Sequence, residues 1–249
     1  MSQPPALTAR PAPAGWHRFT TSLPSDHGGV VVYGADVPTE TDLRLLGSVE
    51  GRRVLDLGCG AGHNAVVLAQ QGAKVLAVDP SADQLATARA RAEEADIRVE
   101  LHQAELADLA FLRSDSIDAA ISVMTLATAD DLARVFRQVH RVLKPEAPLA
   151  CSFPHPAFAM LDPLGEDPLR IVRGYDDATP QAWELDGRDI VDRPRTFAEL
   201  FTTFGRAGFR IDQVIEATAP ATSRPGPSHA DVMRFVPATL VLRARKQGN

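Results

Sequence analysis

The stretch Val54-Leu55-Asp56-Leu57-Gly58-Cys59-Gly60-Ala61-Gly62 decides how this chain should fold. Its apolar first half predicts a buried strand, and the glycines at alternate positions predict a tight turn that leads into a helix. Glycine accepts positive φ angles and has no Cβ, so a ligand can lie against bare backbone at such a turn. Nicotinamide dehydrogenases have a similar turn, so the stretch alone predicts a nucleotide-binding α/β protein without choosing the ligand.

Outward from this stretch, short apolar runs alternate with longer helical patterns, which predicts βαβ units and a parallel sheet. The predicted strands are residues 53–57, 74–78, 97–102, 117–123, 149–153, 209–216 and 235–244, and the predicted helices are residues 39–46, 63–71, 81–94, 130–143 and 196–206. Ser81 with Gln84, and Thr196 with Glu199, have the spacing of a capping box at a helix start. Residues 154–194 are rich in Pro, Gly and Asp and predict a loop-rich insertion over the carboxyl edge of the sheet.

Polar residues follow the predicted strands at that same edge. Asp79 and Pro80 come directly after the second run, and an acceptor-only carboxylate there suits the two hydroxyl donors of a ribose. Glu105 follows the third run, and Ser122-Val123 closes the fourth. Because an open α/β sheet binds ligands outside the carboxyl ends of its strands, these residues predict one shared ligand site.

Asp56, two residues before Gly58, completes the pattern DxGxGxG, which resembles the first motif of the class I S-adenosylmethionine (SAM)-dependent methyltransferases. The resemblance runs in order and spacing over about residues 40–153, including Arg141-Val142-Leu143-Lys144-Pro145. It implies a Rossmann-like, doubly wound sheet of seven strands, mostly parallel with the last strand antiparallel. It also implies SAM as cofactor, S-adenosylhomocysteine as product, and Ser122-Val123 beneath the sulfonium.

The resemblance implies a role for the other residues of the cofactor site. The whole cofactor-binding set is Tyr33, Asp56, Gly58, Cys59, Gly60, Gly62, Asp79, Pro80, Glu105, Leu106, Ser122 and Val123. Asp79 would bind the ribose, Glu105 would accept the adenine amino group, and the Leu106 N–H would meet a ring nitrogen. The family commonly has Asp where Glu105 stands. Tyr33 would reach the cofactor's carboxylate, or would pack at the rim of the core, and Cys59 is interpreted as a small packing residue rather than a nucleophile.

Catalysis is harder to assign, because methyl transfer from a sulfonium needs mainly orientation, exclusion of water and sometimes a base. His155, between Pro154 and Pro156, is the leading candidate ahead of His17, His27 and His229, with the hypothesis that it orients or deprotonates the acceptor. The alternative is a histidine that merely packs between two prolines. Residues 154–194 and 220–237 are expected to roof the acceptor pocket with apolar side chains, namely Phe158, Met160, Tyr175, Trp183 and Phe235.

Composition limits the function classes. The chain has 249 residues, a formal net charge of −6 and a pI near 5.6, which argues against a nucleic-acid substrate. Its two cysteines lie far apart without metal-ligand spacing, and no uninterrupted apolar run is long enough to span a bilayer. These features predict a cytoplasmic protein without a metal site. Residues 1–37 are interpreted as a tail and lid segment, and residues 38–249 as the methyltransferase domain.

The leading prediction is therefore transfer of a methyl group from SAM to an O, N or C atom of a small, aromatic or apolar molecule. The alternatives are an NAD-dependent oxidoreductase, suggested by the shared nucleotide-binding topology, and a catalytically silent SAM-binding module. Ala127 and Thr128 keep the second alternative open, because many members of the resembled family have His-His there. The acceptor and the oligomeric state do not follow from the sequence.

Overall fold

The computed structural model describes residues 29–34, 37–163, 165–185, 188–219 and 231–248. One seven-stranded sheet with the order β3-β2-β1-β4-β5-β9-β8 forms its centre, and β6 and β7 form a separate hairpin. The strands are β1 (Arg53–Leu57), β2 (Lys74–Asp79), β3 (Glu100–Gln103), β4 (Ala119–Val123), β5 (Pro148–Pro154), β6 (Gln181–Leu185), β7 (Arg188–Asp192), β8 (Phe209–Glu216) and β9 (Thr239–Lys246). The pairs among β1 to β5 are parallel, and β9 runs antiparallel to both β5 and β8. The predicted fold class and reversed last strand are confirmed.

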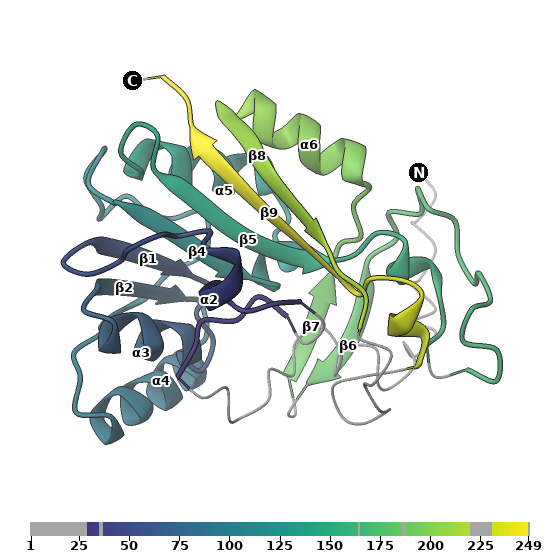
Figure 1. Cartoon of the computed structure of the whole chain (residues 1–249), viewed down its shortest axis with the longest axis horizontal. Coiled ribbons are helices and arrows are strands. Elements are labelled where there is room, and N and C mark those ends of the chain that lie inside the picture. Colours follow the sequence, from purple (N-terminus) through teal and green to yellow (C-terminus); the bar gives the residue numbers. More distant parts are fainter. Residues whose placement is uncertain (1–28, 35–36, 164, 186–187, 220–230, 249) are drawn as a thin grey trace, which may run out of the picture.

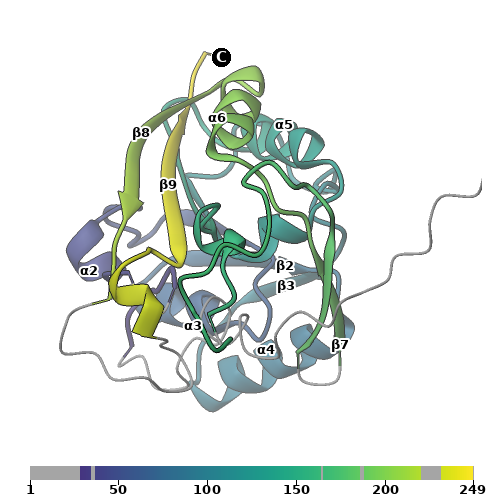
Figure 2. The same ribbon diagram turned by 90° about the vertical axis from the view of Figure 1, so that its right-hand side faces the viewer.

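Helices cover both faces of the sheet, α3 and α4 on one side and α5 and α6 on the other (Figures 1 and 2). The helices are α2 (Glu40–Leu43), α3 (His63–Gln70), α4 (Ala82–Glu94), α5 (Leu132–Val142) and α6 (Phe197–Arg206), with 3-10 turns η1 (Thr125–Thr128), η2 (Phe158–Met160) and η3 (Asp231–Arg234). Successive residues of β1 serve opposite faces, because Val54 packs in the cluster under α3 while Leu55 and Leu57 pack in the cluster under α5.

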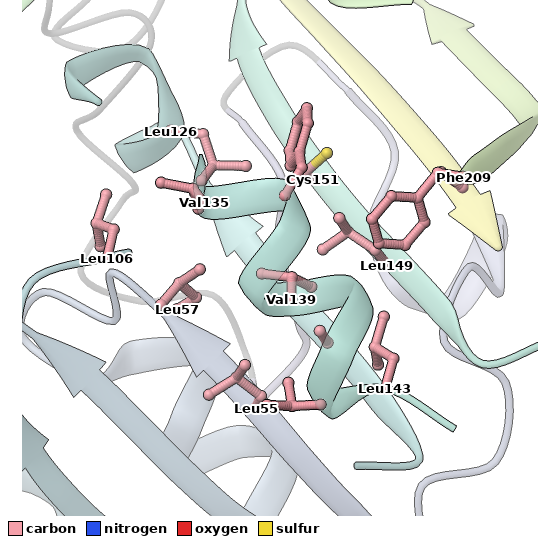
Figure 3. Packing of buried hydrophobic residues seen from close by; sticks show 14 of the residues in the cluster. Leu55, Leu57, Leu106, Leu126, Val135, Val139, Leu143, Leu149, Cys151 and Phe209 are labelled. Atoms are coloured by element: carbon pink, nitrogen blue, oxygen red, sulfur yellow. The ribbon is translucent and has the colours of Figure 1, made fainter. Parts of the chain in front are cut away.

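The apolar stripe of α5 forms the larger core (Figure 3). Val135, Phe136 and Val139 lie on its buried face at helical spacing. Phe136 stacks on Phe204 of α6 with ring centroids 4.1 Å apart, and Phe209 of β8 meets its edge at 6.2 Å. These aromatic contacts fix α6 beside α5, on the face of the sheet opposite α3.

The N-terminal part of the described chain belongs to the core, although the sequence suggested that the domain begins at residue 38. Val31 and Tyr33 are fully buried in the cluster under α3. The Asn64 side chain of α3 holds the segment by accepting from the Val32 N–H at 3.0 Å and donating to the Val32 carbonyl at 2.9 Å. Residues 1–28 and 35–36 of the predicted tail and lid segment lie outside the described residues.

Several predicted boundaries were wrong where a tertiary contact decides the end of an element. The predicted helix over residues 39–46 stops at Leu43, because the Glu40 carboxylate accepts from the N–H groups of Leu45 and Leu46 and Arg44 turns left-handed. β3 begins three residues later than predicted and β9 four residues later. The insertion also contains the β6–β7 hairpin, so it is less loop-rich than expected.

Candidate functional site

The glycine turn after β1 has glycine at three positions, two of them for close packing and one for an open backbone. Gly58, Gly60 and Gly62 all have positive φ angles, of 74°, 52° and 76°. A Cβ at Gly58 would lie 2.3 Å from Thr125 Cγ2, and a Cβ at Gly62 would lie 2.6 Å from Ala88 Cβ. A Cβ at Gly60 would meet nothing within 4 Å. Gly58 and Gly62 therefore permit close packing, whereas Gly60 presents bare backbone to open space, as a ligand requires.

Asp79 at the end of β2 ties this turn to the neighbouring strand. Its Oδ2 accepts from the Gly60 N–H at 2.9 Å, and its Oδ1 accepts from the Ser81 N–H at the same distance. The carboxylate is almost fully buried, yet each oxygen has a second lone pair with which it can accept a hydroxyl. Asp79 thus shapes the turn and offers acceptors at its surface, while Pro80 beside it is exposed.

Asp56 is the most perturbed acid of the site. It is 3% exposed, and burial, with the negative charge of Asp79 as a second cause, raises its pKa from 3.8 to about 7. A backbone hydrogen bond from Ala65 lowers the pKa by a smaller amount. Within the described part of the chain, no hydrogen-bond donor meets Asp56 Oδ2. A buried carboxylate oxygen without a donor is costly, so a cation placed nearby would stabilise the ionised form.

Glu105 and Leu106 follow β3 as the sequence indicated. Glu105 is exposed, and its carbonyl accepts from the Asp108 N–H at 2.9 Å. Leu106 is buried in the core under α5. Ser122 of β4 is fully buried and donates to the Leu57 carbonyl at 2.6 Å, so its hydroxyl links two strands. Val123, next in the chain, is half-buried.

Cys59 and Tyr33 both have contacts that fit packing roles. Burial first, and then the charges of Asp56 and Asp79, raise the pKa of the Cys59 thiol, which opposes a thiolate nucleophile. Tyr33 is fully buried and donates to Glu40 Oε2 at 2.7 Å, which is the packing interpretation of this residue. Burial, together with Glu40, raises the pKa of Tyr33 well above 10.

His155 uses both ring nitrogens within the protein. Its Nε2 lies 2.8 Å from Glu216 Oε1 of β8, and its Nδ1 accepts from the Ala157 N–H at 3.1 Å. These contacts fit a ring with its proton on Nε2, so that Nε2 donates to Glu216 and Nδ1 accepts from Ala157. The side chain is 11% exposed. With its lone pair already engaged, His155 has the geometry of a residue that joins β5 to β8, and its catalytic role stays a prediction.

A pocket lies beyond the carboxyl ends of β4 and β5. Its lining residues are Ala127, Phe153, Pro154, Pro156, Ala159, Met160, Arg173, Gly174, Tyr175, Asp177, Gln181, Asp192, Arg193, Pro194, Arg195 and Leu200. Of the five apolar residues expected there, Met160 and Tyr175 line the pocket, while Phe158 is buried in a separate core and Phe235 is exposed. The side chain of Trp183 lies outside the described residues.

One short turn connects this pocket with the glycine turn. Thr125, the first residue of η1, donates to the Gly58 carbonyl at 2.9 Å, and Ala127 of the same turn lines the pocket. Sequence reasoning missed Thr125, because a threonine after a strand has no distinctive pattern. It also missed the arginines of the pocket, of which the Arg193-Pro194-Arg195 run was the only visible signal.

Comparisons with known proteins agree with this geometry. The methyltransferase domain family matches residues 54–146. A crystal structure of an S-adenosylmethionine-dependent methyltransferase from Mesorhizobium loti is 31% identical, with a TM-score of 0.69, over 86% of this chain and 100% of that one. Another from Listeria monocytogenes is 26% identical, with a TM-score of 0.69, over 83% and 95%. A ubiquinone biosynthesis O-methyltransferase from Azorhizobium caulinodans is 27% identical over 176 residues, 70% of this chain, and the chain spans 64% of that relative's length.

The sheet order, the glycine turn and the acids at its edge define a Rossmann-like nucleotide-binding protein. With the similarity that extends over the whole Mesorhizobium chain, the particular family follows: this chain belongs to the class I SAM-dependent methyltransferases.

The residues present fit SAM, the cofactor of this family. SAM is a cation at its sulfonium and ammonium groups, and Asp56 Oδ2 is a buried acceptor that no described residue serves. Gly60 leaves space beside the turn, and Asp79 has acceptors for a ribose. Contacts of the cofactor with individual residues stay predictions. No cluster of three or more potential metal ligands occurs in the described ranges, and no helix described there is long and apolar enough to cross a membrane.

Proposed function

We propose that this protein transfers a methyl group from SAM to a small molecule held in the pocket beyond β5. The observation that carries the proposal is that η1 joins the glycine turn to the pocket, since Thr125 contacts the glycine turn and Ala127 lines the pocket. A methyl donor against Gly60 and an acceptor in the pocket would then be neighbours, separated by one turn of chain. Such proximity supplies much of the rate enhancement that a two-substrate transfer needs.

SAM supplies the activated methyl group, so the chain's own residues have the tasks of binding, orienting and excluding water. Asp79 would bind the ribose and Asp56 would face the positive charge of the methionine part. Phe153, Met160 and Leu200 make part of the pocket wall apolar, which favours an acceptor with an apolar or aromatic body. The curated relative from Azorhizobium is named an O-methyltransferase, which supports a hydroxyl oxygen as the first acceptor class to test.

We further propose that the protein acts in the cytoplasm, a proposal that the two free cysteines support. Both thiols are at least half-buried, and both are free in the described structure. Fractionation of the native host, with the protein detected by antibody, tests this proposal directly.

Calorimetric titration with S-adenosylhomocysteine, and separately with NAD, tests the cofactor. We expect heat of binding with the first compound and none with the second. Asp79→Asn should weaken binding of S-adenosylhomocysteine about tenfold or more, because a charged acceptor is lost. The matched control is Asp83→Asn, an exposed acid in the first turn of α4, which should bind as the wild type does.

The activity itself is tested by incubating the protein with SAM and a panel of phenols, followed by mass spectrometry for products heavier by one CH2 group. Methylated product that Asp79→Asn fails to form supports the proposal. Binding of S-adenosylhomocysteine without product from any acceptor class would favour the silent SAM-binding module instead. Failure of correctly folded protein to bind S-adenosylhomocysteine contradicts the whole proposal.

A further inference from the structure

Arg173 is the one pocket arginine with a buried nitrogen that the rest of the described chain leaves without an acceptor. Its side chain is 10% exposed, and its Nη2 donates to the Asp177 carbonyl at 2.6 Å and pairs with Asp177 Oδ2 at 3.1 Å. Its Nη1 is shielded from water and makes no hydrogen bond to any described residue. Leaving a guanidinium N–H buried and unpartnered is unfavourable, so the position favours a ligand that brings an acceptor.

The two other arginines of the pocket are already committed to the protein. Arg195 donates to the carbonyls of Ala127 and Ala129, and Arg193 donates to the Thr128 carbonyl and pairs with Asp130. Both therefore fasten the end of the hairpin to the turn that follows β4. Their guanidinium groups shape the pocket wall, and among the three pocket arginines it is Arg173 that has a buried donor nitrogen without an acceptor in the described chain.

The pocket also limits the charge of the ligand. Asp177 and Asp192 line it together with the three arginines, so the wall has only a small positive excess. A singly charged carboxylate suits one available guanidinium nitrogen better than a doubly charged phosphate, which the two acids would repel. Tyr175 adds a second polar group, since its oxygen accepts from the Phe197 N–H at 3.2 Å and its hydroxyl hydrogen can still be donated.

We propose that the methyl acceptor is an aromatic carboxylic acid, and that Arg173 and Tyr175 bind its carboxylate while the apolar wall of the pocket holds its ring. This inference rests on the proposed function and narrows its acceptor class. Because Nη1 is closed off from water, the Arg173 side chain or its segment must shift slightly to admit the carboxylate. The carboxylate would then lie beside a nitrogen that is already shielded from water, and exclusion of water favours methyl transfer.

Benzoate is a suitable probe, with benzamide as its neutral counterpart of the same shape. Protein saturated with S-adenosylhomocysteine is titrated with each compound by ligand-detected NMR and by thermal shift. We expect benzoate to bind and raise the melting temperature, and benzamide to bind about tenfold more weakly or not at all, because charge-assisted hydrogen bonds are the stronger ones.

Three variants locate the binding. Arg173→Gln should lose about tenfold or more in benzoate affinity and change benzamide affinity little. Arg170→Gln removes an exposed arginine three residues away and should leave both affinities unchanged. Asp177→Asn removes the carboxylate that competes for Arg173 but keeps its backbone carbonyl, so benzoate should bind several-fold more tightly. This variant tests the proposal even if Arg173→Gln fails to fold.

Equal affinity for benzoate and benzamide, or a benzoate affinity that Arg173→Gln and Asp177→Asn both leave unchanged, overturns the inference. The proposed function is judged separately by binding of S-adenosylhomocysteine in the same samples. If that compound binds and benzoate does not, the carboxylate assignment fails while the methyltransferase proposal stands. If S-adenosylhomocysteine itself fails to bind, the methyltransferase proposal fails first.

Discussion

The raised pKa of Asp56 leads to a quantitative prediction about stability as well as binding. Its pKa is raised from 3.8 to about 7, chiefly because the carboxyl is buried and secondly because Asp79 lies close. Each pKa unit corresponds to about 1.36 kcal/mol, so ionised Asp56 destabilises the folded protein by about 4 kcal/mol at most. Asp56→Asn removes this charge and should therefore make the ligand-free protein more stable at neutral pH.

The sign and the pH range follow from the two pKa values of Asp56. Below about pH 4 the carboxyl is protonated in both the folded and unfolded states, so the charge has no effect on stability. As the pH rises toward 7, the unfolded state ionises freely and the folded state does not, so wild-type stability falls relative to Asp56→Asn. Above about pH 7 the difference is constant. The amide that Asp56→Asn introduces changes the free energy of unfolding by the same amount at every pH. The pH dependence of the difference between the two proteins therefore reports the effect of the Asp56 charge alone.

Urea denaturation of the wild type and Asp56→Asn at pH 4.5, 6, 7 and 8 measures this difference. Asp118→Asn is the matched control, because it should change the free energy of unfolding in the opposite direction. Burial raises the Asp118 pKa, but hydrogen bonds from the Lys144 ammonium and the Arg53 N–H outweigh it and lower the pKa overall. Ionised Asp118 therefore stabilises the folded protein above about pH 4, and this stability is lost as the pH falls, so Asp118→Asn should be less stable at neutral pH.

Calorimetry with SAM completes the test of Asp56. At pH 8, Asp56→Asn should gain stability and lose about tenfold or more in SAM affinity, because the ligand's positive charge no longer meets a carboxylate. Wild-type affinity for SAM should also rise between pH 5.5 and 7, since binding of a cation favours the ionised carboxyl. A difference in stability that stays flat from pH 4.5 to pH 8 would refute the reasoning about this group.

Three substitutions give further predictions. Gly60→Ala should lower SAM affinity more than stability, because its methyl group enters open space at a φ of 52°, a strain of about 1 kcal/mol. Gly62→Ala should lower the free energy of unfolding by about 2 kcal/mol or more, because the methyl group would lie 2.6 Å from Ala88 Cβ, and urea denaturation distinguishes the two glycines. His155→Ala should lower stability by about 1–3 kcal/mol through the lost contacts to Glu216 and Ala157, with the turnover number unchanged once an acceptor is known. A large fall in turnover at unchanged stability would restore His155 as a catalytic candidate.

Much of the fold could be predicted because its signals are local. The helix starts at Ser81 and Thr196 follow from capping residues, and both side chains accept from the N–H three residues on, at 3.3 Å and 3.1 Å. The β1 turn follows from its glycines, each of which has the positive φ that the pattern requires. Such features depend on a few neighbouring residues, so a single sequence reveals them.

Features that depend on distant contacts could not be predicted in the same way. The end of α2 is set by the Glu40 carboxylate, whose three donors come from both sides of the helix, Tyr33 among them. The β6–β7 hairpin did have a local signal, because Asp186-Gly187 is a dipeptide typical of hairpin turns and stands between two polar–apolar runs. The sequence interpretation gave more weight to the Pro, Gly and Asp content of the segment, which is equally typical of loops.

The cofactor half and the acceptor half of the predicted site also differ in how far they depend on distant contacts. The cofactor half depends on backbone geometry that only glycine and a well-placed acid supply, so its residues can be recognised in any chain that keeps them. The acceptor half depends on which side chains the insertion brings against η1, and Arg193 and Arg195 reach carbonyls 65 to 68 residues earlier in the chain. The insertion can change sequence while the glycine turn stays intact, because the Arg193 N–H of the insertion donates to the backbone carbonyl of Ala127, whereas Thr125 makes the contact with the Gly58 carbonyl. A protein built in this way can acquire a new methyl acceptor without rebuilding its methyl-donor site, so the acceptor of this one has to be inferred from Arg173 and its neighbours rather than from the family motif.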